Sequence, residues 1–466
     1  MTAPTLLRLA TAGSVDDGKS TLVGRLLHDT KSVLADQLAA VEDASRRRGW
    51  TGEVADLALL TDGLRAEREQ GITIDVAYRY FATAKRSFVL ADCPGHVQYT
   101  RNTVTGASTA DVVLVLIDAR NGVVEQTRRH LAVVSLLRVP HVVIAVNKVD
   151  LVDDPAGVYD RIVLDVEDLR RTLHLRDVTV VPICALHGDN VVEPGPRTSW
   201  YAGPTLLDVL EDLPPEQVEG PARFPVQLVI RPQLGAVDPR YVDYRGYAGH
   251  VASGTIRVGD EVIVSSSGVR TRVTGIDRGP VEVTEASAPL SVTLRLADNV
   301  DISRGDVIAS ADRPPVLSRT ADAVLCWLSE RPLTPGARVL VSHGTKTVRA
   351  FVSEVRERLD IESLTLTPTA GAELNDLVSV SLTFAEPLPI EPYSQSRDAG
   401  SLLIIDPHDG WTLAAGLAQT TLPGSPAGAD ALNAAGAAGA AGASRATGVT
   451  IAAGAGQPRE TAEVRL

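Results

Sequence analysis

The sequence has few cysteines, few aromatic residues and no long apolar run, and these scarcities exclude several classes of protein. Its three cysteines, Cys93, Cys184 and Cys326, lie far apart among 466 residues and form no CxxC pair. Their spacing indicates neither a disulfide framework nor a zinc site, and it favours a reducing cytoplasm. The longest apolar runs, 112–117 and 142–146, are strand-sized. A membrane span needs about 18 apolar residues, so we expect no membrane association.

A surplus of positive charge is also missing. The chain has 45 Lys and Arg against 58 Asp and Glu, a net charge of −13. A protein whose main task is to grip nucleic acid needs cationic side chains for phosphate contacts. The balance therefore argues against nucleic acid as a partner, although an acidic total is compatible with a local basic patch.

The first two hundred residues alternate apolar runs with amphipathic stretches. We expect strands at 6–12, 87–90, 111–118, 141–147 and 178–182, with helices such as 19–27 and 126–137 between them. Alternating strands and helices predict a parallel sheet covered on both faces, an α/β fold. The segment 26–68 is too long for a simple loop, and its helix-forming composition predicts a partly helical insertion before a mobile switch.

The pattern changes at a Pro/Glu/Gly linker near 213–225. Short Val- and Thr-rich runs follow at 261–265, 269–276, 291–296, 337–341, 347–355 and 377–384, separated by turn residues. They predict two β-barrels. We expect a nucleotide-binding domain at 1–215, barrels at 222–311 and 312–420, and a disordered Ala/Gly-rich tail at 421–466.

The segment after the first strand matches the phosphate-binding pattern GxxxxGK[ST]. Its glycines let backbone N–H groups surround phosphate oxygens, and the following helix adds its positive end. We expect Lys19 to reach the β- and γ-phosphates and the Ser20 hydroxyl to bind Mg²⁺. A chance glycine turn is the alternative. The predicted nucleotide contacts here are Gly13, Ser14, Val15, Asp16, Asp17, Gly18, Lys19, Ser20 and Thr21.

Two further motifs predict guanine recognition. Asn147, Lys148, Val149 and Asp150 follow an apolar strand as NKxD. An Asp carboxylate there accepts from guanine's ring N–H and exocyclic amine, a donor pair that adenine lacks. Alone, the four residues would suggest a turn. After the last predicted strand, the backbone of Cys184, Ala185 and Leu186 is a candidate contact to the guanine O6.

The remaining motifs predict hydrolysis. In Asp92, Cys93, Pro94, Gly95 and His96, we expect Asp92 to hold Mg²⁺ through a water and the Gly95 N–H to sense the γ-phosphate. His96 is the candidate for orienting the attacking water, with a structural role as the alternative.

A threonine between the phosphate loop and Asp92 completes the set. Thr73, within Gly71-Ile-Thr-Ile, is a candidate Mg²⁺ ligand that closes a switch when the γ-phosphate is present. Strand packing is the alternative for this residue. Lys19, Thr73 and His96 are the predicted catalytic residues, and all five motifs occur in the order that a GTPase requires.

The five motifs followed by barrels resemble the translation-factor GTPases, the class of elongation factors Tu and 1-alpha. Four stretches resemble more closely the GTPase subunit of bacterial sulfate adenylyltransferase: Asp16–Asp29, Asp62–Tyr78, Gln98–Asp111 and Asp243–Gly249. The resemblance covers about residues 6–418. One departure is Cys184, where that family usually has Ser, and a backbone contact to guanine would survive the exchange.

The resemblance implies a function that composition and spacing do not reveal. It implies GTP and Mg²⁺ as cofactors, a cytoplasmic location, and a smaller partner subunit that binds ATP and sulfate. That partner makes adenosine 5′-phosphosulfate and pyrophosphate, an uphill reaction that GTP hydrolysis helps to drive. The alternatives are an RNA-binding translation factor and a regulatory switch with negligible turnover.

Overall fold

The computed structural model describes residues 5–47, 49, 55–60, 76–94, 100–214, 219–232, 235, 242–361, 363–420, 422 and 450–451. They form two compact units. The first runs to the helix α7 (Leu206–Asp212) and includes the short strand β23 (Thr450–Ile451), and the second begins before β7 (Arg223–Ile230). No described helix is both long and apolar enough to cross a bilayer.

The first unit is built on a seven-stranded sheet with the order β2-β3-β1-β4-β5-β6-β23. Every neighbouring pair is parallel except β2 with β3. All seven residues of β4 and of β5 are buried, as expected for central strands of a parallel sheet. Apart from β23, the strands of this sheet are β1 (Thr5–Ala12), β2 (Ala77–Ala82), β3 (Arg86–Asp92), β4 (Val112–Asp118), β5 (His141–Asn147) and β6 (Asp177–Pro182).

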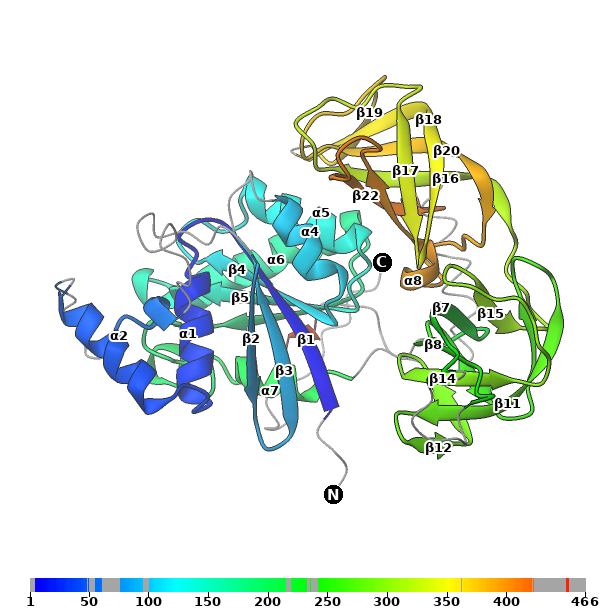
Figure 1. The fold of residues 1–466 in the computed structure, drawn as a ribbon. Coiled ribbons are helices and arrows are strands. Elements are labelled where there is room, and N and C mark those ends of the chain that lie inside the picture. Colours follow the sequence, from blue (N-terminus) through cyan, green and yellow to red (C-terminus); the bar gives the residue numbers. More distant parts are fainter. Residues whose placement is uncertain are drawn as a thin grey trace, which may run out of the picture. The chain divides into compact units, whose positions relative to one another are not determined.

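Helices cover both faces of this sheet (Figure 1). Leu114 and Leu116 of β4 share one apolar cluster with residues of α1 and α7. Side chains alternate along a strand, so Val113 and Val115 face the other side, where α4, α5 and α6 pack. The helices are α1 (Lys19–Asp29), α2 (Ala35–Arg47), α4 (Thr100–Ser108), α5 (Glu125–Leu136) and α6 (Pro155–Leu173), with short turns η1 (Leu57–Leu60), η3 (Val149–Leu151) and η4 (Pro196–Thr198).

The second unit holds two closed six-stranded barrels. The first has the order β10-β15-β7-β8-β14-β11 and closes because β10 also pairs with β11. Its interior is apolar, with Phe224 and Tyr247 almost fully buried. Its other strands are β8 (Gly246–His250), β10 (Glu261–Val264), β11 (Arg270–Arg278), β14 (Ser291–Leu296) and β15 (Val307–Ser310), with β9 (Thr255–Arg257), β12 (Val281–Val283) and β13 (Glu285–Ser287) attached.

The second barrel has the order β17-β21-β22-β16-β20-β18 and closes through β17 and β18. Its strands are longer, and its interior contains Trp327 and Phe384. The elements are β16 (Ser318–Trp327), β17 (Arg338–His343), β18 (Lys346–Asp360), β19 (Thr365–Pro368), β20 (Leu377–Leu388), α8 (Arg397–Gly400), β21 (Ser401–Ile405) and β22 (Thr412–Ala418).

The predicted fold class, an α/β domain followed by two β-barrels, is confirmed. The helices α2 and η1 fall in the segment 26–68, which was predicted to be partly helical. The exact domain limits stay a prediction. The expected disorder of 421–466 falls outside the described residues, apart from Leu422 and the two residues of β23, which pair with β6.

Candidate nucleotide-binding site

Four of the five predicted motifs have described residues at one edge of the sheet. Because β1, β3, β4, β5 and β6 run parallel, the loops that follow them leave the sheet at the same end. In open α/β sheets, ligands bind at this carboxyl edge. The phosphate loop follows β1, Asp92 ends β3, Asn147 ends β5, and Cys184 lies just beyond β6.

The phosphate loop, residues 13–20, depends on backbone conformations that few residues adopt. Gly13 and Gly18 have φ angles of 146° and 95°, and Asp16 has a φ of 65°. Gly18 also caps α1, whose first turn has no side-chain cap and no acidic residue. The N–H groups at this helix end are therefore available to an anion. Ser20 and Thr21 lie half-buried in the first turn of the same helix.

Lys19 lies inside the loop and is 7% exposed. Its ammonium donates to the backbone oxygens of Gly13, at 2.9 Å, and of Ser14, at 2.6 Å. Burial lowers the pKa of Lys19, while the negative charges of Asp17 and Asp92 oppose that shift. Asp17 accepts from the Ser14 N–H at 2.6 Å and so closes the loop on itself. Val15, in contrast, is exposed at the tip.

The side-chain amide of Asn147 joins the phosphate loop to the loop after β6. Its nitrogen donates to the Asp17 backbone oxygen at 2.8 Å, and its oxygen accepts from the Ala185 N–H at 3.0 Å. Asn147 is 2% exposed. One buried side chain thus binds Asp17, which is 130 positions away in the sequence, and Ala185, which is 38 positions away. It brings three of the predicted motifs together.

Lys148 adds a second link between these loops. Its ammonium donates to the backbone oxygen of Asp16 and, at 2.9 Å, to the carboxylate of Asp118 at the end of β4. Arg120 also donates to that carboxylate, at 2.6 Å. Burial alone would raise the pKa of Asp118, but the hydrogen bonds from Arg120 and Lys148 outweigh it and lower the pKa to about 2. Asp118 is therefore a permanent anion at neutral pH.

Asp150 lies in η3, next to the buried Val149. The Cys184 thiol donates to its carboxylate at 2.9 Å. Burial, together with this hydrogen bond, raises the pKa of Cys184 to about 12. The thiol therefore keeps its proton at neutral pH, and one Asp150 oxygen accepts from it.

Asp92 ends β3 and is 2% exposed. The Thr11 hydroxyl donates to its carboxylate at 2.8 Å and accepts from the Cys93 N–H at 3.1 Å, which fixes the start of this loop. Cys93 and Pro94 are buried. Gly95, His96 and Thr73 lie outside the described residues.

Several residues that hold the site were missed from the sequence. Arg25 of α1 donates to the backbone oxygens of Ala185, at 3.2 Å, and of Leu186, and so fixes the loop after β6. No local pattern signals a contact across 160 residues. Asp118 was detectable in principle, because it ends a buried strand at the carboxyl edge. Thr11, within the first strand, has no such signal.

We expect Gly18→Ala to disrupt the phosphate loop. A Cβ at Gly18 would lie 2.4 Å from the Asn147 amide nitrogen. The Asn147 amide cannot move away without breaking its hydrogen bonds to Asp17 and Ala185. The positive φ adds strain of about 1–2 kcal/mol. GDP affinity, measured by calorimetry, should fall at least about tenfold, equivalent to the loss of about 1.4 kcal/mol. Gly122→Ala is the control, because its φ is 64° but its Cβ would meet open space. Equal GDP affinity in both variants would contradict the steric argument.

A buried histidine behind the phosphate loop predicts a pH dependence. His130 of α5 is 3% exposed and hydrogen-bonds to the Gly13 backbone. Burial, and then the Lys19 charge, lowers the pKa of His130 to about 3. The unfolded chain binds this proton near pH 6.5 and the folded one does not, so stability is lost as the pH falls below 6.5.

The expected loss is about 1.4 kcal/mol per pH unit, or roughly 2 kcal/mol between pH 6.5 and pH 5. Urea unfolding of wild type and of His130→Gln at both pH values measures this contribution as the difference between their losses. If the variant loses as much stability as the wild type on acidification, His130 is not the group responsible.

Comparison with known proteins agrees with the fold. Residues 5–216 match the family "Elongation factor Tu GTP binding domain", and residues 320–419 match "GTP-eEF1A C-terminal domain-like". A "Sulfate adenylyltransferase subunit 1" from Erwinia tasmaniensis is 47% identical over 430 residues, which cover 90% of this chain and 88% of that protein. The chain belongs to the sulfate adenylyltransferase subunit 1 family.

Two other proteins are also similar to this chain. A "Bifunctional enzyme CysN/CysC" from Mycobacterium tuberculosis is 52% identical over 417 residues, which cover 89% of this chain and 67% of that longer protein. Among solved structures, sup35 complexed with GDP aligns at 22% identity and a TM-score of 0.40, covering 91% of this chain and 95% of that one. The family match over residues 5–216 shows that the first unit of this chain contains a GTP-binding domain of the elongation factor Tu type.

Proposed function

We propose that this chain is the GTP-hydrolysing subunit of a sulfate adenylyltransferase. In this proposal, GTP hydrolysis is coupled to the formation of adenosine 5′-phosphosulfate and pyrophosphate from ATP and sulfate by a partner subunit. The observation that carries the proposal is the joining of the phosphate loop, Asn147 and the Ala185 loop at one sheet edge, in a chain of this family.

The phosphate loop has the donors that a triphosphate needs. Lys19 supplies a buried positive charge, and the first turn of α1 supplies backbone N–H groups. The Ser14 hydroxyl is buried and has no hydrogen-bond partner among the residues that the structure describes. Buried polar groups are normally paired, so this hydroxyl is a further candidate donor to a phosphate oxygen.

The groups proposed to hold Mg²⁺ are hard oxygen atoms, which suit this ion. Ser20 offers a hydroxyl at the start of α1, and Asp92 offers a carboxylate that Thr11 holds in place and that acts through a water. Thr73 is the third proposed ligand. When bound, Mg²⁺ neutralises phosphate charge. The chain's own contribution is to orient these oxygens beside the Lys19 ammonium.

Guanine recognition is assigned to Asp150 and the loop after β6. The Asp150 carboxylate has lone pairs left for two guanine donors beside the Cys184 thiol. In the loop, the N–H groups of Ala185 and Gly188 already have protein partners. The Leu186 N–H has none among the described residues, so it is the proposed contact to the guanine O6.

His96 is proposed to orient the water that attacks the γ-phosphate. We expect His96→Ala to slow GTP turnover by about 10²-fold, because positioned proton acceptors contribute on this order. GDP affinity should stay within about twofold, since a change of roughly 0.4 kcal/mol is small for a group that does not hold the nucleotide. Single-turnover hydrolysis and calorimetry check the two parts. Equal, near-zero hydrolysis by both proteins, with and without the partner, would favour a regulatory switch instead.

The coupled function has a direct test. The chain is expressed with a candidate small ATP-binding subunit, the complex is purified, and adenosine 5′-phosphosulfate is measured with GTP, with GDP and without nucleotide. Of these three conditions, we expect only GTP to increase the yield of adenosine 5′-phosphosulfate, because GTP hydrolysis makes the uphill reaction favourable. A competent complex with no GTP stimulation would overturn the proposal.

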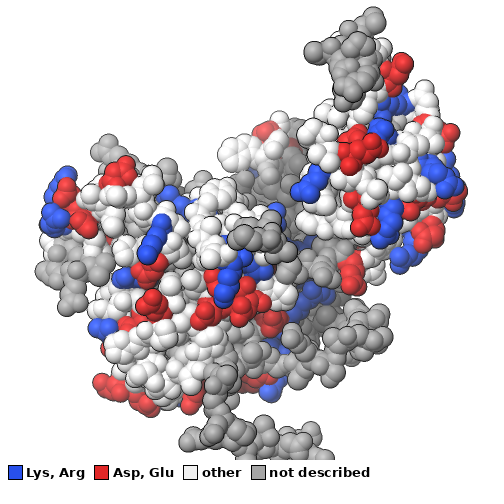
Figure 2. All heavy atoms as spheres, turned by 90° about the horizontal axis from the view of Figure 1, so that it is seen from below, with Lys and Arg blue, Asp and Glu red and all other residues white. Residues whose placement is uncertain are grey.

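Membership of the sulfate adenylyltransferase subunit 1 family supports the proposed function over that of an RNA-binding translation factor. Figure 2 shows acidic and basic side chains interspersed over the displayed face of each unit, without a continuous basic surface. The net charge of −13 points the same way. Salt-sensitive binding of aminoacyl-tRNA by the GTP form would revive the alternative.

A further inference from the structure

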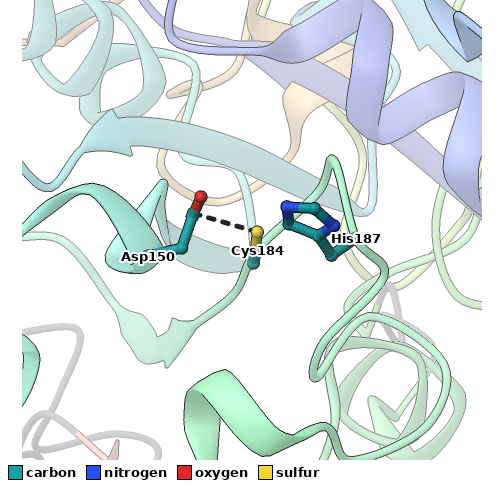
Figure 3. Close-up of side chains that lie close together, drawn as sticks. All are labelled: Asp150, Cys184 and His187. Carbon is teal, nitrogen blue, oxygen red and sulfur yellow. Dashed lines mark hydrogen bonds between the residues drawn. The ribbon is translucent and has the colours of Figure 1, made fainter. Parts of the chain in front are cut away.

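Three side chains of metal-binding type meet beside the proposed guanine pocket. Asp150 comes from η3, after β5, and Cys184 and His187 come from the loop after β6. One ligand atom of each lies within 4.8 Å of the other two. Figure 3 shows the Cys184 sulfur between the Asp150 carboxylate and the His187 ring.

We infer that Asp150, Cys184 and His187 form a site for Zn²⁺ or a similar divalent transition metal, and that the bound ion excludes guanine nucleotides. The second half rests on the proposed function, because it assigns guanine recognition to Asp150. One thiolate, one imidazole and one carboxylate make a three-residue zinc ligand set that leaves a fourth position to water. The sulfur and nitrogen ligands favour this class over Mg²⁺ or Ca²⁺.

The geometry needs little adjustment to bind an ion. Tetrahedral zinc ligands about 2.0–2.3 Å from the metal lie roughly 3.3–3.8 Å from one another. The sulfur and the Asp150 oxygen are 2.9 Å apart, so a bound ion would separate them slightly. His187 is exposed, so its side chain can turn to complete the set.

The proton balance of the site is simple. The Cys184 thiol donates a hydrogen bond to Asp150, and on binding the metal replaces the thiol proton. A Zn–S bond forms, one proton leaves to solvent, and no oxidation state changes. The His187 backbone also hydrogen-bonds to the sulfur.

Metal and guanine compete for the same carboxylate. An Asp150 oxygen that coordinates a cation no longer accepts from the guanine N–H groups. The ion also places positive charge where guanine would present its donors. Zn²⁺ should therefore raise the apparent Kd of GDP by a factor that grows linearly with the free Zn²⁺ concentration divided by the Kd of the metal.

The metal half is tested on the full-length protein, freed of nucleotide and metal. Zn²⁺ is titrated by calorimetry, and Co²⁺ is used as the spectroscopic probe of a thiolate ligand. We expect one ion per chain, with affinity lowered at least about tenfold, or about 1.4 kcal/mol, by Cys184→Ser and by His187→Ala. The thiolate-to-cobalt absorption should disappear in Cys184→Ser. Cys326→Ser and His408→Ala, both in the second barrel, are the matched controls.

Affinity for the metal that is unchanged in both site variants would overturn the inference. The competition half is tested by measuring GDP affinity with and without Zn²⁺ in wild type and His187→Ala. We expect Zn²⁺ to weaken GDP binding only in the wild type, and simultaneous binding of both ligands would overturn exclusion. GDP binding in Mg²⁺ buffer with a zinc-selective chelator tests the proposed function alone, so the two failures are distinguishable.

Discussion

Replacement of Lys19 by methionine is expected to lower GTP turnover by about 10²- to 10³-fold, because it removes a preorganised charge from the transferring phosphoryl group. Methionine has a similar length and no donor. The Lys19 ammonium is buried between the Gly13 and Ser14 oxygens, and Lys19 is the only cationic residue among positions 13–20.

Nucleotide affinity should fall as well. A hydrogen bond to a charged group contributes about 1.5–3 kcal/mol, so the Kd for GTP should rise by roughly 10- to 100-fold. Single-turnover hydrolysis at saturating GTP separates the two effects. Lys85→Met is the control, because the Lys85 side chain is exposed and its ammonium pairs with Glu211 of α7, outside the phosphate loop. Normal hydrolysis by Lys19→Met, with its circular dichroism spectrum preserved, would contradict the assigned role.

The second large effect concerns the base. Asp150→Asn should weaken GTP binding by about 10²- to 10⁴-fold, since two hydrogen bonds to a charged acceptor are lost, each contributing about 1.5–3 kcal/mol. Xanthosine triphosphate carries an oxygen in place of guanine's amine. The Asn amide donates to that oxygen and accepts from the ring N–H, so this nucleotide should bind better.

Calorimetry with both nucleotides measures the exchange of preference. Asp153→Asn is the matched control: it makes the same change of charge three residues away, at an exposed position. An unchanged preference for GTP in Asp150→Asn would mean that the guanine pocket lies elsewhere. Stronger xanthosine triphosphate binding by the control variant would mean that net charge, and not the hydrogen-bond pattern, decides the preference.

The sequence predicted two kinds of feature: buried strands, which form apolar runs, and motifs whose residues are close together in the chain. The strand β5 was predicted with its observed limits, because a run of five apolar residues, 142–146, lies between His141 and Asn147. The strand β2 was missed. It lies at the edge of the parallel strands, and its Tyr78 and Tyr80 are 49% and 71% exposed, so it lacks the apolar run that marked the others.

Contacts between distant residues were the part of the site that the sequence could not predict. The cysteine spacing gave no hint of a metal site, because the three proposed ligands come from two loops that only the fold brings together. Arg25 and Asn147 likewise act on residues far along the chain. Local motifs contain the groups that bind a nucleotide, whereas the residues that fix the conformation of each loop are distant in the sequence and are brought to it by the fold.

Asn147 has a consequence for nucleotide exchange. Its two hydrogen bonds are made within the protein, so the loops around base and phosphate are fastened by the chain itself. The entropy of ordering these loops is therefore lost when the protein folds and not each time a nucleotide arrives. We expect the described loops to keep their conformation when GDP leaves the proposed site, so the concentrations and affinities of the nucleotides, and not a reordering of these loops, decide which one binds next.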